Sequence, residues 1–214
     1  MRFLGVIIDE NLSWKSHIDH ICKKNWKGSG VLHRIRRQVP GYILLQLYST
    51  LILSHINYAL SAYGSSDNCN MKRVLTLQKK AIRCITNSPY NSHCNPLFVK
   101  HKLLNVHDLY AISCLKVAYN FKHNRLPVYH TTALASPNQM ALTTRQSHDF
   151  YIPMTRSRIA KQCLKYKIGS IWNSLPLTLK DYGKSVYAYA SKLKAHFLSK
   201  YDVACQIRNC YICH

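Results

Sequence analysis

Apolar residues recur along most of the chain at intervals of three and four, the spacing of amphipathic helices. Ser13 is a credible N-cap for a long first helix, and Gly28 and Gly30 are expected to weaken or kink its middle. Further helices are predicted over residues 40–56, 70–85, 109–121, 157–172 and 185–201, with a shorter one starting at Pro96. The pattern therefore predicts a mainly α fold, a helical bundle with a second small helical part.

Two stretches break the helical pattern. Arg2 to Asp9 is too short for a helix and rich in β-branched residues, so it predicts a short N-terminal β-strand. Between Arg125 and Pro153 the apolar residues follow no helical or strand periodicity, which indicates a surface excursion between two helical parts. The predicted organisation is a strand segment over 1–12, a helical domain over 13–124, an irregular excursion over 125–156, a C-terminal helical region over 157–204 and a Cys-rich tail over 205–214.

The charge of the chain narrows the choice of partner. Thirty Lys and Arg stand against eight Asp and Glu, a net charge of +22. A domain with this imbalance repels itself unless a polyanion shares its surface, and nucleic acid (RNA, DNA or an RNA–DNA hybrid) is the common polyanion. A membrane partner is not expected, because the charge is spread along the chain and no apolar run approaches about 20 residues.

Basic residues line the outer faces of two predicted helices. Cations at these spacings would suit phosphate contacts, although a solvated helix face is an equally good reading of each one. The candidates for nucleic-acid binding are Lys23, Lys27, Arg34 and Arg37 in the first helix, and Lys79, Lys80 and Arg83 in the third.

Residues for catalysis or metal binding are sparse. The acids do not cluster, and no phosphate-binding glycine loop or nucleophile motif occurs, so no catalytic residue and no cofactor is predicted. His17 and His20 lie three apart near Cys22, but an exposed helical pair is the favoured interpretation. The only other metal candidates, held as weak because half of a zinc site is missing, are Cys205, Cys210, Cys213 and His214. Nine cysteines without a signal peptide indicate reduced thiols and an intracellular protein, nuclear or cytoplasmic.

Several short strings share their order and spacing with one known family. They are Phe3-Leu4-Gly5-Val6 followed by Asp9, Leu12, Trp14 and His17-Ile18; Leu47-Tyr48, Leu51-Ile52 and Ile56-Asn57-Tyr58; Leu77 to Arg83; Thr144-Arg145 and Tyr151-Ile152-Pro153; Ile171 to Pro176; and Ser191 to Tyr201. Together they resemble the region after the polymerase palm in reverse transcriptases of non-LTR retrotransposons, the LINE-like elements of the Jockey kind.

The resemblance implies a role for each part of the chain. Phe3, Leu4 and Gly5 would belong to a primer-grip-like strand, and the helices after it to a thumb that holds a template–primer duplex. The family's catalytic Asp-Asp lies upstream of the point where this chain begins, so the fragment is not expected to be an enzyme on its own. Magnesium is expected only for a complete parent enzyme. The alternatives are a host-adopted helical module for protein–protein interaction and a non-functional, pseudogene-like product.

Overall fold

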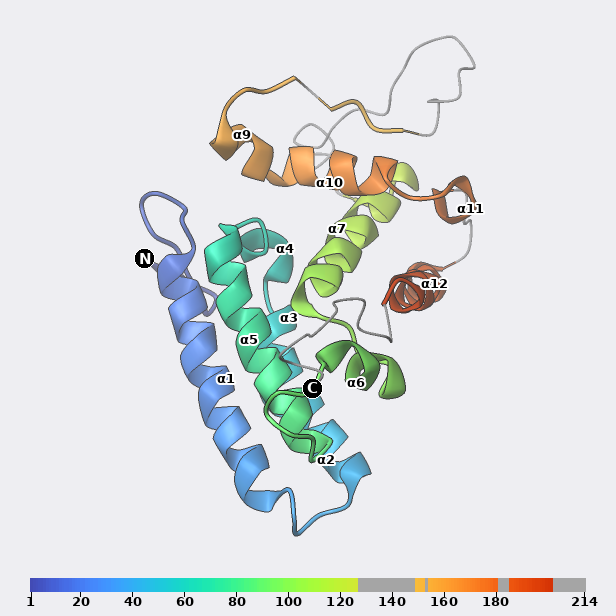
Figure 1. The fold of residues 1–214 in the computed structure, drawn as a ribbon. Helices are drawn as coiled ribbons and strands as arrows, with labels where there is room; N and C mark the ends of the chain where they lie inside the picture. Colours follow the sequence, from blue (N-terminus) through green and yellow to red (C-terminus); the bar gives the residue numbers. More distant parts are fainter. Residues whose placement is uncertain (127–148, 153, 181–184, 202–214) are drawn as a thin grey trace. The chain divides into compact units, whose positions relative to one another are not determined.

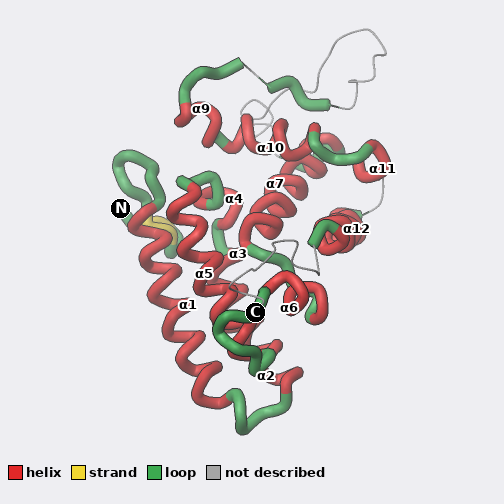
Figure 2. The backbone as a smooth tube through the Cα atoms, viewed as in Figure 1, coloured by secondary structure: helices red, strands yellow, loops and turns green. Residues whose placement is uncertain are grey.

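The computed structural model describes residues 1–126, 149–152, 154–180 and 185–201 of the 214. The prediction of a mainly α fold is confirmed: the elements are helices except for one small hairpin near the N-terminus (Figure 2). The chain forms two compact units, one of residues 1–109 with 197–214 and one of residues 110–196. The predicted domain boundaries stay a prediction, and the tail over 205–214 and most of the excursion over 125–156 lie outside the described residues.

The first unit holds the hairpin and most of the helices (Figure 1). Its elements are β1 (Arg2–Phe3), β2 (Val6–Ile7), α1 (Lys15–Ile35), α2 (Gly41–Tyr48), the π-helical turn η1 (Ser49–Leu53), α3 (Ser54–Asn57), α4 (Leu60–Tyr63), α5 (Asn68–Ile85), α6 (Cys94–Lys100) and the start of α7 (Val106–Lys122). The second unit holds the rest of α7, α9 (Arg158–Gln162), α10 (Leu164–Asn173), α11 (Leu177–Lys180) and most of α12 (Val186–Ser199).

The N-terminal residues form a hairpin, so the prediction of one continuous strand from Arg2 to Asp9 is wrong. β1 pairs antiparallel with β2, and the turn between them places Leu4 at φ 46° and Gly5 at φ 83°. Two successive positive φ values are the geometry of the tight hairpin turns that match strand twist. The Tyr58 hydroxyl donates a hydrogen bond to the Leu4 carbonyl and so fastens the turn to the end of α3.

The start of α1 is held by a carboxylate together with the Ser13 hydroxyl, which accepts the Lys15 backbone N–H at 3.4 Å. Trp14, at φ 62°, is the residue before the helix, which makes the Ser13 N-cap prediction wrong by one residue. The Asp9 carboxylate accepts hydrogen bonds from the backbone N–H groups of Ser13 and Trp14, both at 3.0 Å, and from the Ser13 hydroxyl. These bonds, the one from the Ser13 hydroxyl above all, lower the pKa of Asp9.

α1 and α5 run side by side in the same direction, as Figures 1 and 2 show. Near their starts Arg73 pairs with Asp19 at 2.6 Å. The side of α1 that faces the core repeats at alternating intervals of three and four, the seam of coiled-coil-like packing. The members of that seam are Ile18, Ile21, Asn25, Gly28 and Leu32.

Gly28 does not interrupt α1, and the expectation that Gly28 and Gly30 weaken or kink its middle stays a prediction. The helix is continuous from Lys15 to Ile35. A Cβ on Gly28 would stand 3.1 Å from the Leu51 carbonyl oxygen, so this glycine lets α1 approach the backbone of η1 closely. A Cβ on Gly30 would meet nothing within 4 Å, because that residue faces outward.

Gln78 is a fully buried hub of the first unit. Its amide nitrogen donates to the Tyr48 hydroxyl at 3.0 Å and to the Leu104 carbonyl at 2.9 Å, and its amide oxygen accepts the Val106 N–H at 2.9 Å. One side chain therefore joins α2, α5 and the start of α7. This is the role that the structure gives to the glutamine of the string from Leu77 to Arg83.

Asn173 plays a comparable part in the second unit. Its side-chain amide exchanges two hydrogen bonds, each 2.9 Å, with the backbone N–H and carbonyl of Phe150. The buried Lys180 ammonium donates to the Asn173 carbonyl at 3.0 Å and pairs with Asp149 at 2.7 Å.

The predicted helix over 157–172 is interrupted at Cys163, whose extended backbone (ψ 141°) separates α9 from α10.

Candidate nucleic-acid interface

Of the four cations predicted on the first helix, three lie on the exposed side of α1, whereas Arg37 lies in the turn two residues beyond its end. Lys23, Lys27, Arg34 and Arg37 are all exposed, whereas the seam residues of the same helix are buried against α5 and η1. None of the four pairs with a carboxylate within the described part of the chain. Their role in nucleic-acid binding stays a prediction, and their geometry leaves them open to solvent.

The three cations predicted on α5 differ in their surroundings. Lys80 is exposed and Lys79 is half-buried. The Arg83 Nε donates to the Ser92 carbonyl at 2.9 Å, and its guanidinium lies 5.8 Å from the centre of the Tyr90 ring. Arg83 therefore holds the loop after α5, which is a structural contact that the helical pattern did not reveal.

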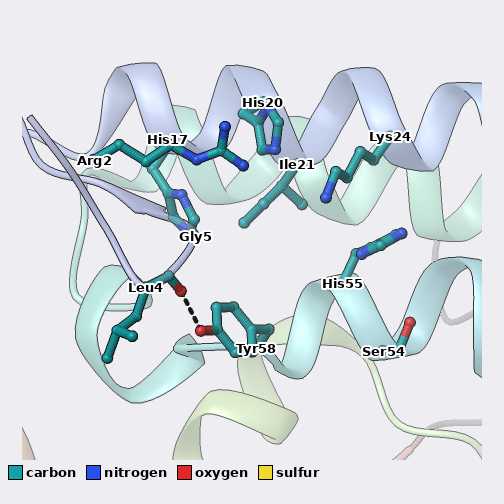
Figure 3. Close-up of a pocket in the computed structure, with 10 residues that line it drawn as sticks. All are labelled: Arg2, Leu4, Gly5, His17, His20, Ile21, Lys24, Ser54, His55 and Tyr58. Atoms are coloured by element: carbon teal, nitrogen blue, oxygen red, sulfur yellow. Dashed lines mark hydrogen bonds between the residues drawn. The ribbon is translucent and has the colours of Figure 1, made fainter.

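A pocket lies between the hairpin, α1 and α3, and the sequence analysis did not predict it. It encloses about 430 Å³ (Figure 3). Side chains of Arg2, His20 and Lys24 converge on it from β1 and α1, and those of His55 and Tyr58 from α3 and its end. Its walls are completed by Leu4, Gly5, His17, Ile21 and Ser54.

The pocket carries positive charge and no negative charge. Arg2 and Lys24 supply two full charges, and none of the lining residues is an Asp or Glu. Burial lowers the pKa of His20 first, and the nearby Lys24 and Arg2 lower it further. Burial and then Lys24 lower the pKa of His55 in the same way. Burial, and after it the neighbouring cations, disfavour the protonated form of both histidines, and an anion in the pocket would offset the repulsion from those cations.

His17 closes the inner end of the pocket. It is buried, so the prediction that His17 and His20 form an exposed pair is wrong for His17. Its Nδ1 accepts the Ile7 N–H at 3.4 Å, and its ring meets the Tyr63 ring edge-on with centroids 5.2 Å apart. Burial, then His20 and Lys24, lower its pKa. The buried Nε2 has no hydrogen-bond partner among the described residues.

The structure does not assemble a metal centre in the described ranges. No three His, Cys, Asp or Glu side chains gather there closely enough to hold an ion. Cys22 is half-buried, and burial raises the pKa of its thiol. The four weak candidates at the C-terminus, Cys205, Cys210, Cys213 and His214, lie outside the described residues, so their prediction remains a prediction.

Two of the three primer-grip-like residues line the pocket. Leu4 and Gly5 form part of its wall, while Phe3 is exposed and is not among its lining residues. The sequence pattern named His20 only as the helical neighbour of His17 and did not point to Arg2, Lys24 or His55, because these residues come together only through the fold. The available sign of such a site was that His20 and Lys24 lie one helical turn apart, on the same side of the predicted helix.

Over the described residues, no helix combines the length and the apolar character needed to cross a membrane.

Comparison with known proteins finds one informative similarity. The chain is 26% identical, over 97 residues, to the RNA-directed DNA polymerase from mobile element jockey of Drosophila funebris. The match covers 42% of this chain and 10% of that polymerase. No protein-family model matches the chain, and no solved structure matches it. A region of the chain is therefore related to a retrotransposon reverse transcriptase, and the chain spans only a small part of that relative's length.

Proposed function

We propose that this chain is the part of a retrotransposon reverse transcriptase that follows the palm, and that it holds template–primer nucleic acid by its phosphates. In this proposal the hairpin is the primer-grip-like element, and the helices from α1 to α5 are the thumb-like element. The similarity to the jockey polymerase supports the origin. The observation that carries the binding role is a set of exposed cations along α1 that pair with no carboxylate of the described residues, beside a pocket whose lining holds no Asp or Glu.

The spacing of the α1 cations suits a nucleic-acid backbone. From Lys23 to Arg34 the helix rises about 16 Å at 1.5 Å per residue. One strand of a duplex carries about five phosphates over that length, at about 3.4 Å each. The three cations of the helix, with Arg37 two residues beyond its end, can therefore each approach a different phosphate. Contacts of this kind position a strand without reading its bases.

Polymerisation would need the catalytic carboxylates of a palm, with magnesium, in the complete parent enzyme. In the proposal this chain supplies grip and orientation only. The pocket would hold one further phosphate group near the hairpin, with Arg2 and Lys24 as permanent charges and the histidines as donors.

The salt dependence of binding tests the proposal. The full chain is titrated with a fluorescent RNA–DNA hybrid at several salt concentrations, beside a variant with Lys23, Lys27, Arg34 and Arg37 all changed to Gln. Each phosphate contact contributes about 0.9 to the slope of log affinity against log salt, so the loss of four contacts should make the variant's slope shallower by about 3.6.

The matched control removes four exposed cations of the second unit by the same change, at Lys116, Lys161, Lys165 and Lys194. It should lower the slope far less. An equal decrease of the slope in both variants would mean that binding is nonspecific charge attraction. An affinity that does not respond to salt would favour a protein partner instead.

A further inference from the structure

Trp26 is a large apolar side chain on the exposed side of α1. It is 70% exposed, while Trp172 of the second unit is fully buried and Trp14 is half-buried. The core-facing seam of α1 is complete without it. Nothing in the packing of the helix therefore accounts for an indole ring at this position.

The exposed neighbours of Trp26 on the helix surface are cations and a glycine, while Cys22 and Ser29 beside it are half-buried. Lys23 lies one turn before it, Lys27 follows it directly, and Gly30 lies one turn after it. A Cβ at Gly30 would meet nothing within 4 Å, so the surface beside the indole is free of any side chain at that point. Arg34 stands one turn beyond the gap and is exposed. An open apolar ring is thus bordered by positive charge at both ends.

This combination points to one class of partner. An exposed Trp that binds a protein partner usually lies within a contiguous apolar patch. The cations around Trp26 interrupt such a patch. Unpaired nucleotides offer flat apolar bases between negative phosphates, which matches a flat ring between cations. Stacking of this kind tolerates any base, because every base has a π-face.

We propose that Trp26 stacks on an unpaired base of a nucleic-acid strand that lies along α1, with Gly30 leaving room for the nucleotide. Lys23 and Lys27 bind the phosphates next to that base. The inference rests on the proposed function, since it places a strand on this side of the helix, and it adds a preference for single-stranded or frayed segments over a closed duplex.

Tryptophan fluorescence of the full chain provides the test, with a 12-nucleotide oligo(dT) and a blunt 12-base-pair duplex as probes. Stacking should quench the emission with oligo(dT) more than with the duplex. Trp26→Ala should weaken oligo(dT) binding about tenfold, the typical effect of losing one stacked base. Trp26→Phe keeps a ring and should recover most of that loss. Gly30→Gln fills the gap and should weaken oligo(dT) binding without touching the ring.

The control is Trp14→Phe, which should leave oligo(dT) affinity and most of the quenching in place. Unchanged affinity in Trp26→Ala, together with a salt-dependent hold on the RNA–DNA hybrid, would overturn the stacking role and leave the proposed function standing. Absence of salt-dependent binding to either probe would overturn both. Self-association of the chain that Trp26→Ala abolishes would assign the ring to a protein contact and would also overturn the stacking role.

Discussion

Polar side chains in the first unit fall into two contrasting regions. Around Gln78 every polar atom of the buried amide has a partner supplied by the chain itself. Around the pocket, Arg2, Lys24 and two partly buried histidines face one another without a carboxylate among the lining residues. We call the region around Gln78 closed, because the chain itself satisfies its polar atoms, and the region around the pocket open, because no carboxylate among the lining residues balances its charges.

The difference separates what specifies the fold from what awaits a ligand. A buried amide with all its hydrogen bonds satisfied fixes one arrangement of the elements it joins. A cluster of like charges costs stability unless something of opposite charge occupies it. Resemblance to a family points to both regions equally, since Gln78 and Leu4 each belong to a recurring string. Only the structure assigns Gln78 to packing and Leu4 to the wall of a pocket.

The closed region should be the more sensitive to substitution. Gln78→Leu keeps the size of the side chain but leaves the Tyr48 hydroxyl, the Leu104 carbonyl and the Val106 N–H buried without partners. At about 1–3 kcal/mol for each unsatisfied group, the free energy of unfolding should fall by about 4 kcal/mol in urea titrations. Lys80→Ala, exposed on the same helix, should change it by less than about 0.5 kcal/mol. A loss below about 1 kcal/mol for Gln78→Leu would contradict the hub.

The second unit offers a smaller version of the same test. Asn173→Ala removes both hydrogen bonds to the Phe150 backbone, and the free energy of unfolding should fall by about 2 kcal/mol. Amide exchange at Phe150 should accelerate in the variant, measured by mass spectrometry. Ser174→Ala, next in sequence and exposed, is the control and should leave that exchange rate close to the original one.

The two glycines of α1 test the contrast between a buried and an open helix surface. Gly30→Ala should raise the free energy of unfolding by up to about 1 kcal/mol, since alanine favours helix and the position is open. Gly28→Ala should instead lower it by about 1 kcal/mol, because its Cβ would press on the Leu51 carbonyl. Urea titrations of both variants compare them directly, and equal shifts would mean that α1 does not approach η1 as described.

The open region should show the smallest effect, and one that depends on pH. The pKa values of His20 and His55 are lower in the folded chain than their ordinary value of 6.5. The unfolded chain therefore binds more protons, and stability should decline as the pH falls through 6.5 towards the folded values. Solvent screening keeps the loss for this pair to about 0.5 kcal/mol. Inorganic phosphate should offset it more than chloride at equal ionic strength.

The pKa values of other histidines are lowered too, so the measurement needs a control that removes only the contribution of His20 and His55. Burial lowers the pKa values of His17, which lines the same pocket, and of His101, His107 and His123 as well. The double variant His20→Asn, His55→Asn should retain their share of the decline with pH and lose the extra protection by phosphate. Protection that persists undiminished in the double variant would place the anion elsewhere.

The sequence was informative where short-range order decides the structure. The period of apolar residues located the long helices, including the run from Leu44 to Ile56 and the helix that became α5. It failed where the outcome depends on geometry at one residue: Leu4 adopts a positive φ that only Gly5 beside it suggests, and Cys163 turns extended within an apolar helical pattern.

The candidate site was predictable only in part, for a physical reason. Leu4 and Gly5 were named from a local string, and they line the pocket. Arg2 and His55 are more than fifty positions apart, and no local pattern brings them together. The same holds for the partners of Gln78, which lie 30, 26 and 28 positions away. Their meeting depends on how α1, η1 and α5 pack, and the close approach that Gly28 permits is part of that packing.

The π-helical turn η1 has a consequence for how this chain can change in length. Buried positions Leu44, Tyr48, Ile52 and Ile56 repeat every four residues, and a regular α-helix would rotate each about 40° past the one before. The wider turn takes up one extra residue and cancels most of that drift, so Tyr48 and Ile56 stay on one side. A single-residue deletion within Ser49–Leu53 would restore regular pitch and leave both anchors in place. Evolution can therefore shorten the chain by one residue at this turn and keep Tyr48 and Ile56 on one side.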